Sequence, residues 1–448
     1  MRNLLLPALL CLCIATKAQT IVQRDPEIEA MLREVSADSM KSYINTLVAF
    51  GTRNTLSTQT DPKRGIGAAR NWVLSRFNEM AKQSGGRLTA IIDTVTLAPD
   101  GRRVVRYVLL GNVVATLKGT DPNDNRIFLI SGHLDNMRSS PTDSIGDAPG
   151  ANDDGSGVAA VMECARVMSK RNFPATIIFI AVSGEEQGLL GANFMSEKAK
   201  KGNWNIEAVL NNDIMGSNNS NETGIINNTQ IRVFSEGLPA YETEKSATNI
   251  RTLGLENDGK SRQLARYVKE IGERYVDNLQ VMLIYRNDRF LRGGDHTPYV
   301  QRGFAAVRFT EMNENYTRQH KDIRTENGIA YGDLPEHIDF EYLRKNTCMN
   351  LANLANLAKA PSMPDSVKME VRRLSNSTSL TWKLPRSGKV KGYYVLVRET
   401  TSAFWQRKIF TTETSIILPM SKDNYFFAVQ SVNDTGNESL PVVPVPGR

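Results

Sequence analysis

The sequence predicts an α/β fold, in which helices cover both faces of a mostly parallel central sheet, followed by a C-terminal all-β sandwich of immunoglobulin-like size. Two observations predict the first part. Short runs that are apolar throughout follow one another along the chain, and segments with helical periodicity separate them. A strand without polar alternation is buried on both faces of its sheet. The second part is predicted by the change of pattern after Ala360, where short strand-like runs separated by turn residues replace the alternation.

Residues 1–18 have the features of a signal peptide. A basic N-terminus precedes the apolar run Leu4–Ala15, which is too short to cross a bilayer, and Ala18 offers a small residue for cleavage. We therefore expect an exported protein, secreted or periplasmic. A lipid anchor at Cys11 or Cys13 is the alternative, and the leucine before each cysteine disfavours it.

The composition excludes some classes of partner. The formal net charge of the chain is +7, and removal of residues 1–18, which hold two basic and no acidic residues, lowers it to +5. Without clustered runs of Lys or Arg, this excess does not indicate nucleic-acid binding. We expect no transmembrane segment in the mature chain. Its two cysteines, Cys164 and Cys348, leave one disulfide or two buried thiols open.

The mature chain opens with three helical patterns and two extended segments. The expected helices cover Ile28–Val35, Ser36–Leu47 and Arg64–Ala81, and the extended segments cover Arg87–Thr96 and Arg103–Leu117.

Strands and helices then alternate as in a parallel sheet. The expected strands are Ile127–Ser131, Ala175–Val182, Ala208–Asn212 and Ala305–Thr310, and the expected helices are Ser156–Ser169, Gly188–Lys200, Ser261–Val276 and Phe340–Lys359. The segment Ser217–Lys260 is polar and carries no pattern that predicts a structure.

A domain boundary is expected at Ala360-Pro361, between a catalytic domain of residues 19–360 and a β-domain of residues 361–448. The β-domain resembles a fibronectin type III domain, with Trp382 on an early strand and Tyr393 on the next. An all-β secretion-sorting module is the alternative. For its role, a spacer or stabilising appendage is favoured over a binding module.

Polar side chains follow the apolar run that ends at residue 130. His133 and Asp135 come directly after this run, and Asp153 and Asp154 precede the expected helix Ser156–Ser169. Taken alone, both pairs have structural interpretations, because a His-x-Asp after a strand can be a structural pair and aspartates cap helix N-termini.

Two further strands end in the same way. Glu185 and Glu186 follow the strand Ala175–Val182, and Asp213 follows Ala208–Asn212. Because parallel strands bring their carboxyl ends to one edge of the sheet, where α/β folds place their sites, we expect these groups to converge. Imidazole and carboxylate ligands together are typical of a metal site.

This combination of motifs resembles the exported zinc aminopeptidases with co-catalytic metals, a family related to glutamate carboxypeptidases and glutaminyl cyclases. The matching motifs are Gly132-His133-Leu134-Asp135, Gly150-Ala-Asn-Asp153-Asp154-Gly-Ser-Gly157, Gly184-Glu185-Glu186-Gln-Gly188-Leu-Leu-Gly191, Asn212-Asp213 and Gly294-Asp295-His296-Thr-Pro298. They cover the catalytic domain. The resemblance implies a sheet of the zinc-exopeptidase type and two Zn²⁺ ions.

The resemblance also implies the ligand set. Asp153 would bridge the two zinc ions, with His133 and Asp213 completing one site and Glu186 and His320 the other.

For the last ligand, the sequence also offers His296. In the family, however, this ligand follows the strand that here is Gly303–Thr310, and the loop after that strand carries His320. We therefore assign His320 as the ligand and expect His296 to be a cleft residue near the substrate.

Supporting roles follow from the same resemblance. Asp135 would accept a hydrogen bond from the second ring nitrogen of His133, and the Asp153–Asp154 peptide would be cis. Glu185 would act as general base on a water held between the metals. Relatives often add a tyrosine that stabilises the oxyanion, and Tyr285, Tyr299 and Tyr316 are the candidates.

The predicted function is that of an aminopeptidase that removes N-terminal residues from peptides. A dipeptidase or carboxypeptidase of the same family is the alternative. Glutaminyl cyclisation is disfavoured, because cyclases of this fold use one zinc and depart from the full ligand set that this chain keeps. The preferred side chain and the oligomeric state are not predicted.

Overall fold

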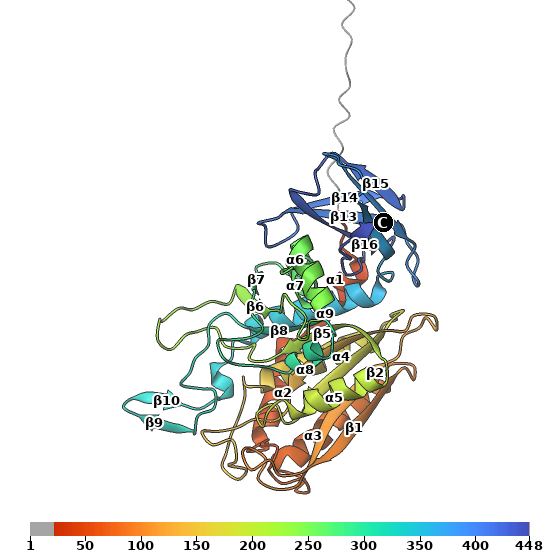
Figure 1. Cartoon of the computed structure of the whole chain (residues 1–448). Coiled ribbons are helices and arrows are strands. Elements are labelled where there is room, and N and C mark those ends of the chain that lie inside the picture. Colours follow the sequence, from red (N-terminus) through yellow and green to blue (C-terminus); the bar gives the residue numbers. More distant parts are fainter. Residues whose placement is uncertain (1–21, 448) are drawn as a thin grey trace, which may run out of the picture.

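The computed structural model describes residues 22–447, so the predicted signal peptide lies outside the described residues (Figure 1). The helices are α1 (Pro26–Glu34), α2 (Ala37–Ala49), α3 (Gly65–Ala81), α4 (Gly155–Met168), α5 (Leu190–Lys201), α6 (Glu244–Leu253), α7 (Lys260–Tyr275), α8 (Thr297–Gln301), η1 (Pro335–His337) and α9 (Phe340–Lys359).

An eight-stranded sheet with the order β1-β2-β4-β3-β5-β8-β6-β7 forms the centre of the molecule. Its strands are β1 (Leu88–Leu97), β2 (Val108–Leu117), β3 (Arg126–His133), β4 (Thr176–Val182), β5 (Asn205–Asn212), β6 (Gln230–Phe234), β7 (Gln280–Ile284) and β8 (Ala306–Glu311). The run β4-β3-β5-β8 in the middle is parallel, whereas β1, β2 and the β6–β8 pair add antiparallel neighbours. The predicted mixed α/β fold with a mostly parallel sheet is confirmed.

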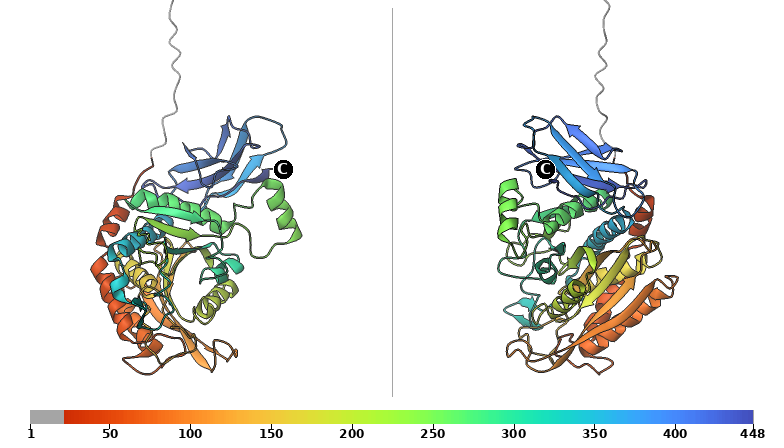
Figure 2. Two further views of the ribbon diagram at one scale, coloured as in Figure 1. Left: turned by 90° about the vertical axis from the view of Figure 1, so that its left-hand side faces the viewer. Right: turned by 45° about the vertical axis from the view of Figure 1, so that its right-hand side comes forward.

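Both faces of the sheet are buried, as the apolar strands predict. Along β3, Phe128 and Ile130 pack into one core with helices α1–α4, α7 and α9, whereas Leu129 packs into a second core with α5 and α8. In Figure 2 the red helices at the N-terminus and the olive helix α5 lie on opposite sides of the sheet.

Several helix starts are fixed by capping side chains. Ser36 accepts a hydrogen bond from the amide of Ser39 at α2, and Asp339 accepts one from Tyr342 at α9. Such caps satisfy amides that have no partner within the helix. The boundaries predicted for these helices lie within a few residues of those observed.

The segment between β5 and α7 contains elements that the sequence did not predict. Strand β6 and helix α6 lie there, and β7 follows α7. None of the residues of α6 is buried, and the helix is polar on average, so its few apolar residues did not predict it. Strand β6 has only five residues and lies near the edge of the sheet, where partial burial leaves a mixed pattern.

After α9 the chain forms two facing sheets. Strands β11 (Asp365–Glu370), β12 (Thr378–Lys383), β15 (Ser415–Leu418) and β17 (Val445–Gly447) make one, and β13 (Gly392–Glu399), β14 (Arg407–Thr411) and β16 (Tyr425–Val432) make the other. Their shared core contains Trp382 and Tyr393, whose rings meet edge to face at 5.3 Å. All pairings are antiparallel except that of β11 with β17. The fibronectin type III assignment stays a prediction.

A small hairpin of β9 (Arg324–Glu326) and β10 (Ile329–Tyr331) projects from the catalytic part (Figure 1). Cys164 and Cys348 are buried free thiols. None of the helices within residues 22–447 is long and apolar enough to span a bilayer.

Candidate metal centre

The predicted site residues lie at the carboxyl edge of the parallel strands. His133 is the last residue of β3, Glu185 and Glu186 follow β4 after two intervening residues, and Asp213 directly follows β5. Asp153 reaches the same place from the loop that precedes α4. The strand order places β3 between β4 and β5, and this adjacency brings the three strand ends together.

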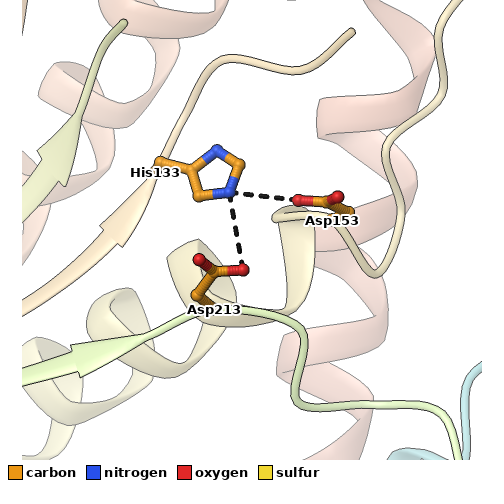
Figure 3. Close-up of side chains that lie close together, drawn as sticks. All are labelled: His133, Asp153 and Asp213. Carbon is orange, nitrogen blue, oxygen red and sulfur yellow. Dashed lines mark ion pairs between the residues drawn. The ribbon is translucent and has the colours of Figure 1, made fainter. Parts of the chain in front are cut away.

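One group of potential ligands consists of His133, Asp153 and Asp213 (Figure 3). Nε2 of His133 lies 3.1 Å from an oxygen of Asp153 and 3.8 Å from one of Asp213. All three side chains are almost completely buried. Their ligand atoms point to a common centre, as Figure 3 shows.

A second group consists of Asp153, Glu186 and His320. Nε2 of His320 lies 2.9 Å from the second oxygen of Asp153 and 3.1 Å from Glu186. The two oxygens of Asp153 therefore face different histidines, and this carboxylate is common to both groups. The loop after β8 delivers His320, whose backbone adopts the left-handed conformation with φ of 56°.

Hydrogen bonds orient the ring of His133. Its Nδ1 lies 3.0 Å from the backbone oxygen of Asp135, and donation to this carbonyl leaves Nε2 free to face the centre. Asp135 is thus the partner of this nitrogen, as expected, through its backbone oxygen, whereas its carboxylate lies 3.8 Å from Nδ1. It accepts instead from the amides of Glu185 and Glu186 and from the hydroxyl of Thr55. Asp135 therefore positions the pair of glutamates.

Asp154 is a structural residue. Its peptide bond to Asp153 is cis, as expected. Its carboxylate accepts hydrogen bonds from the amides of His133, Gly157 and Ile214, at 2.8, 3.0 and 3.1 Å. One side chain thus caps α4 and joins the ends of β3 and β5, in line with the capping interpretation of this aspartate.

The buried carboxylates of the centre lie so close together that a bound cation would stabilise their ionised forms. Burial, together with the neighbouring carboxylates of Asp213 and Glu186, raises the pKa of Glu185 well above its usual value. For His133, burial opposes protonation, but Asp154, Asp153 and Asp213 outweigh it and raise the pKa. Crowded carboxylates of this kind are stabilised by cations. The donor set of two imidazoles and three carboxylates fits zinc.

The sequence did not reveal the buried arginine beside Asp213. Arg308 is fully buried and lies 3.0 Å from an oxygen of Asp213, and it also pairs with Asp288 at 2.8 Å. Burial alone would raise the pKa of Asp213, but Arg308 and His133 lower it to about 2. The sequence shows only that Arg308 interrupts an otherwise apolar strand. It does not show that Asp213, which follows a different strand, is its partner.

Two further residues hold the loop of Asp153. The carboxylate of Asp333 accepts from the amides of Asn152 and Asp153, at 2.9 and 2.7 Å. The guanidinium of Arg53, which is 1% exposed, donates to the carbonyls of Pro149 and Gly150, at 2.7 and 2.8 Å. Both residues are far from this loop in sequence, and neither belongs to a motif.

The expectation that His296 is a cleft residue near the substrate is wrong. This side chain is fully buried, and its Nε2 lies 2.6 Å from the backbone oxygen of Asn287. The three tyrosines proposed for the oxyanion are also outside the cleft: Tyr285 bonds to Ala403, Tyr299 is fully buried and Tyr316 is half exposed.

A cleft of about 300 Å³ opens above the candidate centre. Glu185 and His320 retain partial exposure, so they face this space. The remaining walls come from the loops after β1, β3, β4 and β7, and their lining residues include Arg103, Met137, Gly188, Leu189, Arg289, Leu291, Arg292 and Gly293.

Comparison with known proteins places the chain in a family. Residues 112–334 match the profile of peptidase family M28. A protein of Leptosphaeria maculans, named probable zinc metalloprotease, is 42% identical over 424 residues, which cover 94% of this chain and 98% of that protein. The chain belongs to peptidase family M28. A similarly named protein of Pyricularia oryzae is 41% identical over 430 residues, covering 94% of this chain and 85% of the relative.

Solved structures of the same fold come from Legionella pneumophila. The LapA aminopeptidase is 19% identical with a TM-score of 0.52, over 76% of this chain and 78% of LapA. LapB is 17% identical with a TM-score of 0.52, over 75% of each chain. At 17% and 19% identity, this similarity shows a shared fold and nothing further.

Proposed function

We propose that this M28 peptidase is a zinc-dependent aminopeptidase that hydrolyses the first peptide bond of its substrates. The observation that carries the proposal is the sharing of Asp153 between two groups of potential ligands, with Glu185 beside them in the cleft. The names of the relatives, probable zinc metalloproteases, support zinc as the metal.

Two zinc ions would be held by the residues of the candidate centre. His133 and Asp213 would complete one site and Glu186 and His320 the other, with Asp153 common to both. When bound, zinc polarises a carbonyl and lowers the pKa of a water towards neutrality.

Glu185 is suited to move protons in this reaction. Its amide is held by Asp135 at 3.2 Å, its side chain lines the cleft, and it belongs to neither ligand group. It would take the proton of the attacking water and deliver it to the leaving amine.

The experiment combines metal analysis with an activity assay. We expect about two zinc per chain, and hydrolysis of aminoacyl-anilides that is lost on chelation and restored by zinc. Release of residues from the C-terminus of blocked peptides would instead support the carboxypeptidase alternative, and cleavage restricted to dipeptides would support a dipeptidase. One zinc with pyroglutamate formation would contradict the proposal in favour of a glutaminyl cyclase.

We further propose that the protein is exported after removal of residues 1–18, and that the β-domain is a stabilising appendage. N-terminal sequencing of the protein from a culture medium or periplasm would test the first point. A start at residue 19 is expected, and a lipid-modified cysteine at residue 11 or 13 would contradict it.

A further inference from the structure

The mouth of the cleft carries arginines that the metal chemistry does not need. Arg103 and Arg292 line the cleft from loops on different elements, together with the candidate ligands and Glu185. We infer that Arg103 and Arg292 form a subsite for a carboxylate of the substrate, close to the scissile bond. This inference rests on the proposed peptidase function and names the substrate class of the same site.

Arg103 is held in place by its own turn. The carboxylate of Asp100 accepts from the backbone amides of Arg102, Arg103 and Val104, at 2.7, 3.0 and 2.9 Å, and so fixes the turn between β1 and β2. One guanidinium nitrogen of Arg103 donates to the backbone oxygen of Glu186 at 2.5 Å. Across residues 22–447, the rest of its guanidinium has no hydrogen bond or ion pair.

Arg292 lies in the loop that links β7 to α8. Asp288 anchors this loop, because its buried carboxylate pairs with Arg308 at 2.8 Å and accepts from the amide of Arg289 at 2.5 Å. The amide of Arg292 donates to the backbone oxygen of Arg289 at 3.0 Å. Its exposed guanidinium has no ion pair or hydrogen bond to any other described residue.

The charges of the cleft explain why the two arginines matter. Arg289, the third arginine of the lining, already has partners, because it pairs with Glu314 at 2.8 Å and lies 3.6 Å from Asp288. The negative charges of the four carboxylates in the lining would be balanced by the positive charges of two divalent cations. These carboxylates are Asp153, Glu185, Glu186 and Asp213. Arg103 and Arg292 then remain as positive charges without a counterpart in the lining. A guanidinium binds a carboxylate through two parallel hydrogen bonds, so a carboxylate is the group that fits.

The lining also contains apolar side chains, which would suit an uncharged substrate. Met137, Leu189 and Leu291 are the apolar residues of the cleft. Leu291 is 92% exposed and therefore forms little of an enclosed wall. The arginines are the more selective feature, because an apolar wall discriminates weakly between neutral side chains.

The carboxylate can come from two places in a short peptide. It is either an acidic side chain of the N-terminal residue or the free C-terminus of a dipeptide. Both place a negative charge within one residue of the bond that is cleaved.

The test measures binding, so that turnover does not limit it. The zinc-loaded full-length Glu185→Gln protein is titrated calorimetrically with glutamyl-alaninamide against glutaminyl-alaninamide, and with alanyl-alanine against alanyl-alaninamide. In at least one pair we expect the ligand with the extra carboxylate to bind about 10- to 100-fold more tightly. The first pair reports on the side chain and the second on the C-terminus.

Substitution of the arginines tests the assignment. Arg103→Gln and Arg292→Gln, each added to the Glu185→Gln protein, should reduce the preference within the pair towards unity, while the neutral ligand keeps its affinity. Arg102→Gln and Arg286→Gln are matched controls, because these exposed arginines are close in sequence but do not line the cleft. Zinc content is measured for every variant, since Arg103 also contacts the backbone of Glu186.

Equal or undetectable binding of charged and neutral ligands, or a preference that survives both substitutions, would overturn the inference. The activity assay of the unsubstituted protein separates this failure from that of the proposed function. Hydrolysis of aminoacyl-anilides without any charge preference would reject only the subsite. Selective carboxylate binding that depends on the arginines, without hydrolysis of any peptide, would reject only the peptidase reaction.

Discussion

At the scale of the residue, the geometry of Asp153 decides what this site can hold. Its two oxygens face His133 and His320, at 3.1 and 2.9 Å, so one carboxylate serves two neighbouring sites. Glu185 lies next to the ligand candidate Glu186 in sequence, yet belongs to neither group. Adjacent carboxylates can therefore have separate roles, one towards a metal and one towards a proton.

Replacement of Glu185 by Gln should separate these roles. The amide keeps the shape of the side chain but cannot accept the proton, so kcat should fall by about 100-fold or more. The metal content should stay at the level of the unsubstituted protein, as measured by atomic absorption. An active variant would show that Glu185 is not the base.

His320 and His296 should differ in the same assay. His320→Ala removes a potential ligand of the group with Glu186, so we expect about one zinc equivalent to be lost, together with activity. His296 is buried against Asn287, so His296→Asn should lower the midpoint of thermal unfolding and leave the zinc content unchanged. Loss of zinc from the His296 variant would restore it as a candidate ligand.

At the scale of the element, the loop before α4 depends on groups outside it. Arg53 donates to the carbonyls of Pro149 and Gly150 and also to that of Leu134, at 2.8 Å, and it lies fully inside the protein. Carbonyls buried without a donor are costly, so this guanidinium stabilises the loop of Asp153 as well as the end of β3.

Arg53→Met should therefore lower the free energy of unfolding by roughly 3 kcal/mol or more, because several buried carbonyls lose their donor. Denaturation by urea would measure this loss. The control is Arg64→Met, which removes the exposed ion pair with Asp147 and should change the free energy by less than about 1 kcal/mol. Equal effects of the two substitutions would contradict the role assigned to Arg53.

Strand β5 provides a prediction about pH. Glu207 faces a cavity of about 860 Å³ between the central sheet and the β-domain, and burial raises its pKa from 4.5 to about 7. The folded protein thus binds this proton more tightly than the unfolded chain, so stability declines as the pH rises from about 4.5 through 7.

Glu207→Gln removes this penalty. The variant should exceed the parent by about 1–2 kcal/mol in unfolding free energy at pH 8, and the two should be nearly equal at pH 4.5. Urea denaturation at both pH values would measure the difference. An advantage of equal size at both values would show that ionisation is not its cause.

At the scale of the whole molecule, buried ion pairs join the β-domain to the catalytic part. Asp258 pairs with Arg266 of α7 at 2.9 Å and with Arg398 of β13 at 2.5 Å. Glu438 pairs with Arg274 of α7 at 2.9 Å and with Lys408 of β14 at 2.5 Å. These contacts fix the β-domain against α7, which is itself part of the main core.

Glu438→Gln should destabilise the protein by about 1–3 kcal/mol, because Arg274 and Lys408 would lose their fully buried counter-charge and keep only the partly exposed Glu270. Calorimetric unfolding would measure the effect. Asp434→Asn serves as the control within the same domain, since its pair with Lys389 is solvent-exposed, and it should leave the stability unchanged. A neutral effect of Glu438→Gln would mean that the contact between the domains does not depend on this charge.

The sequence by itself determined the mixed α/β fold and the groups that meet at its site. The apolar strands β3, β4 and β5 and the polar residues that end them are local patterns, because burial on both faces and turn chemistry act over a few residues. Strand β6, next to the edge strand β7, is short and only partly buried, and helix α6 is exposed along its length, so local patterns did not predict them.

Only the tertiary structure decided which side chains complete the site. Arg308, Asp333 and Arg53 act through partners that are distant in sequence, and His296 is excluded from the cleft by burial against Asn287. The physical reason is that electrostatic and hydrogen-bond partners are set by strand order and loop packing. A local pattern shows which residue can ionise or coordinate, but not which group it will face in the fold.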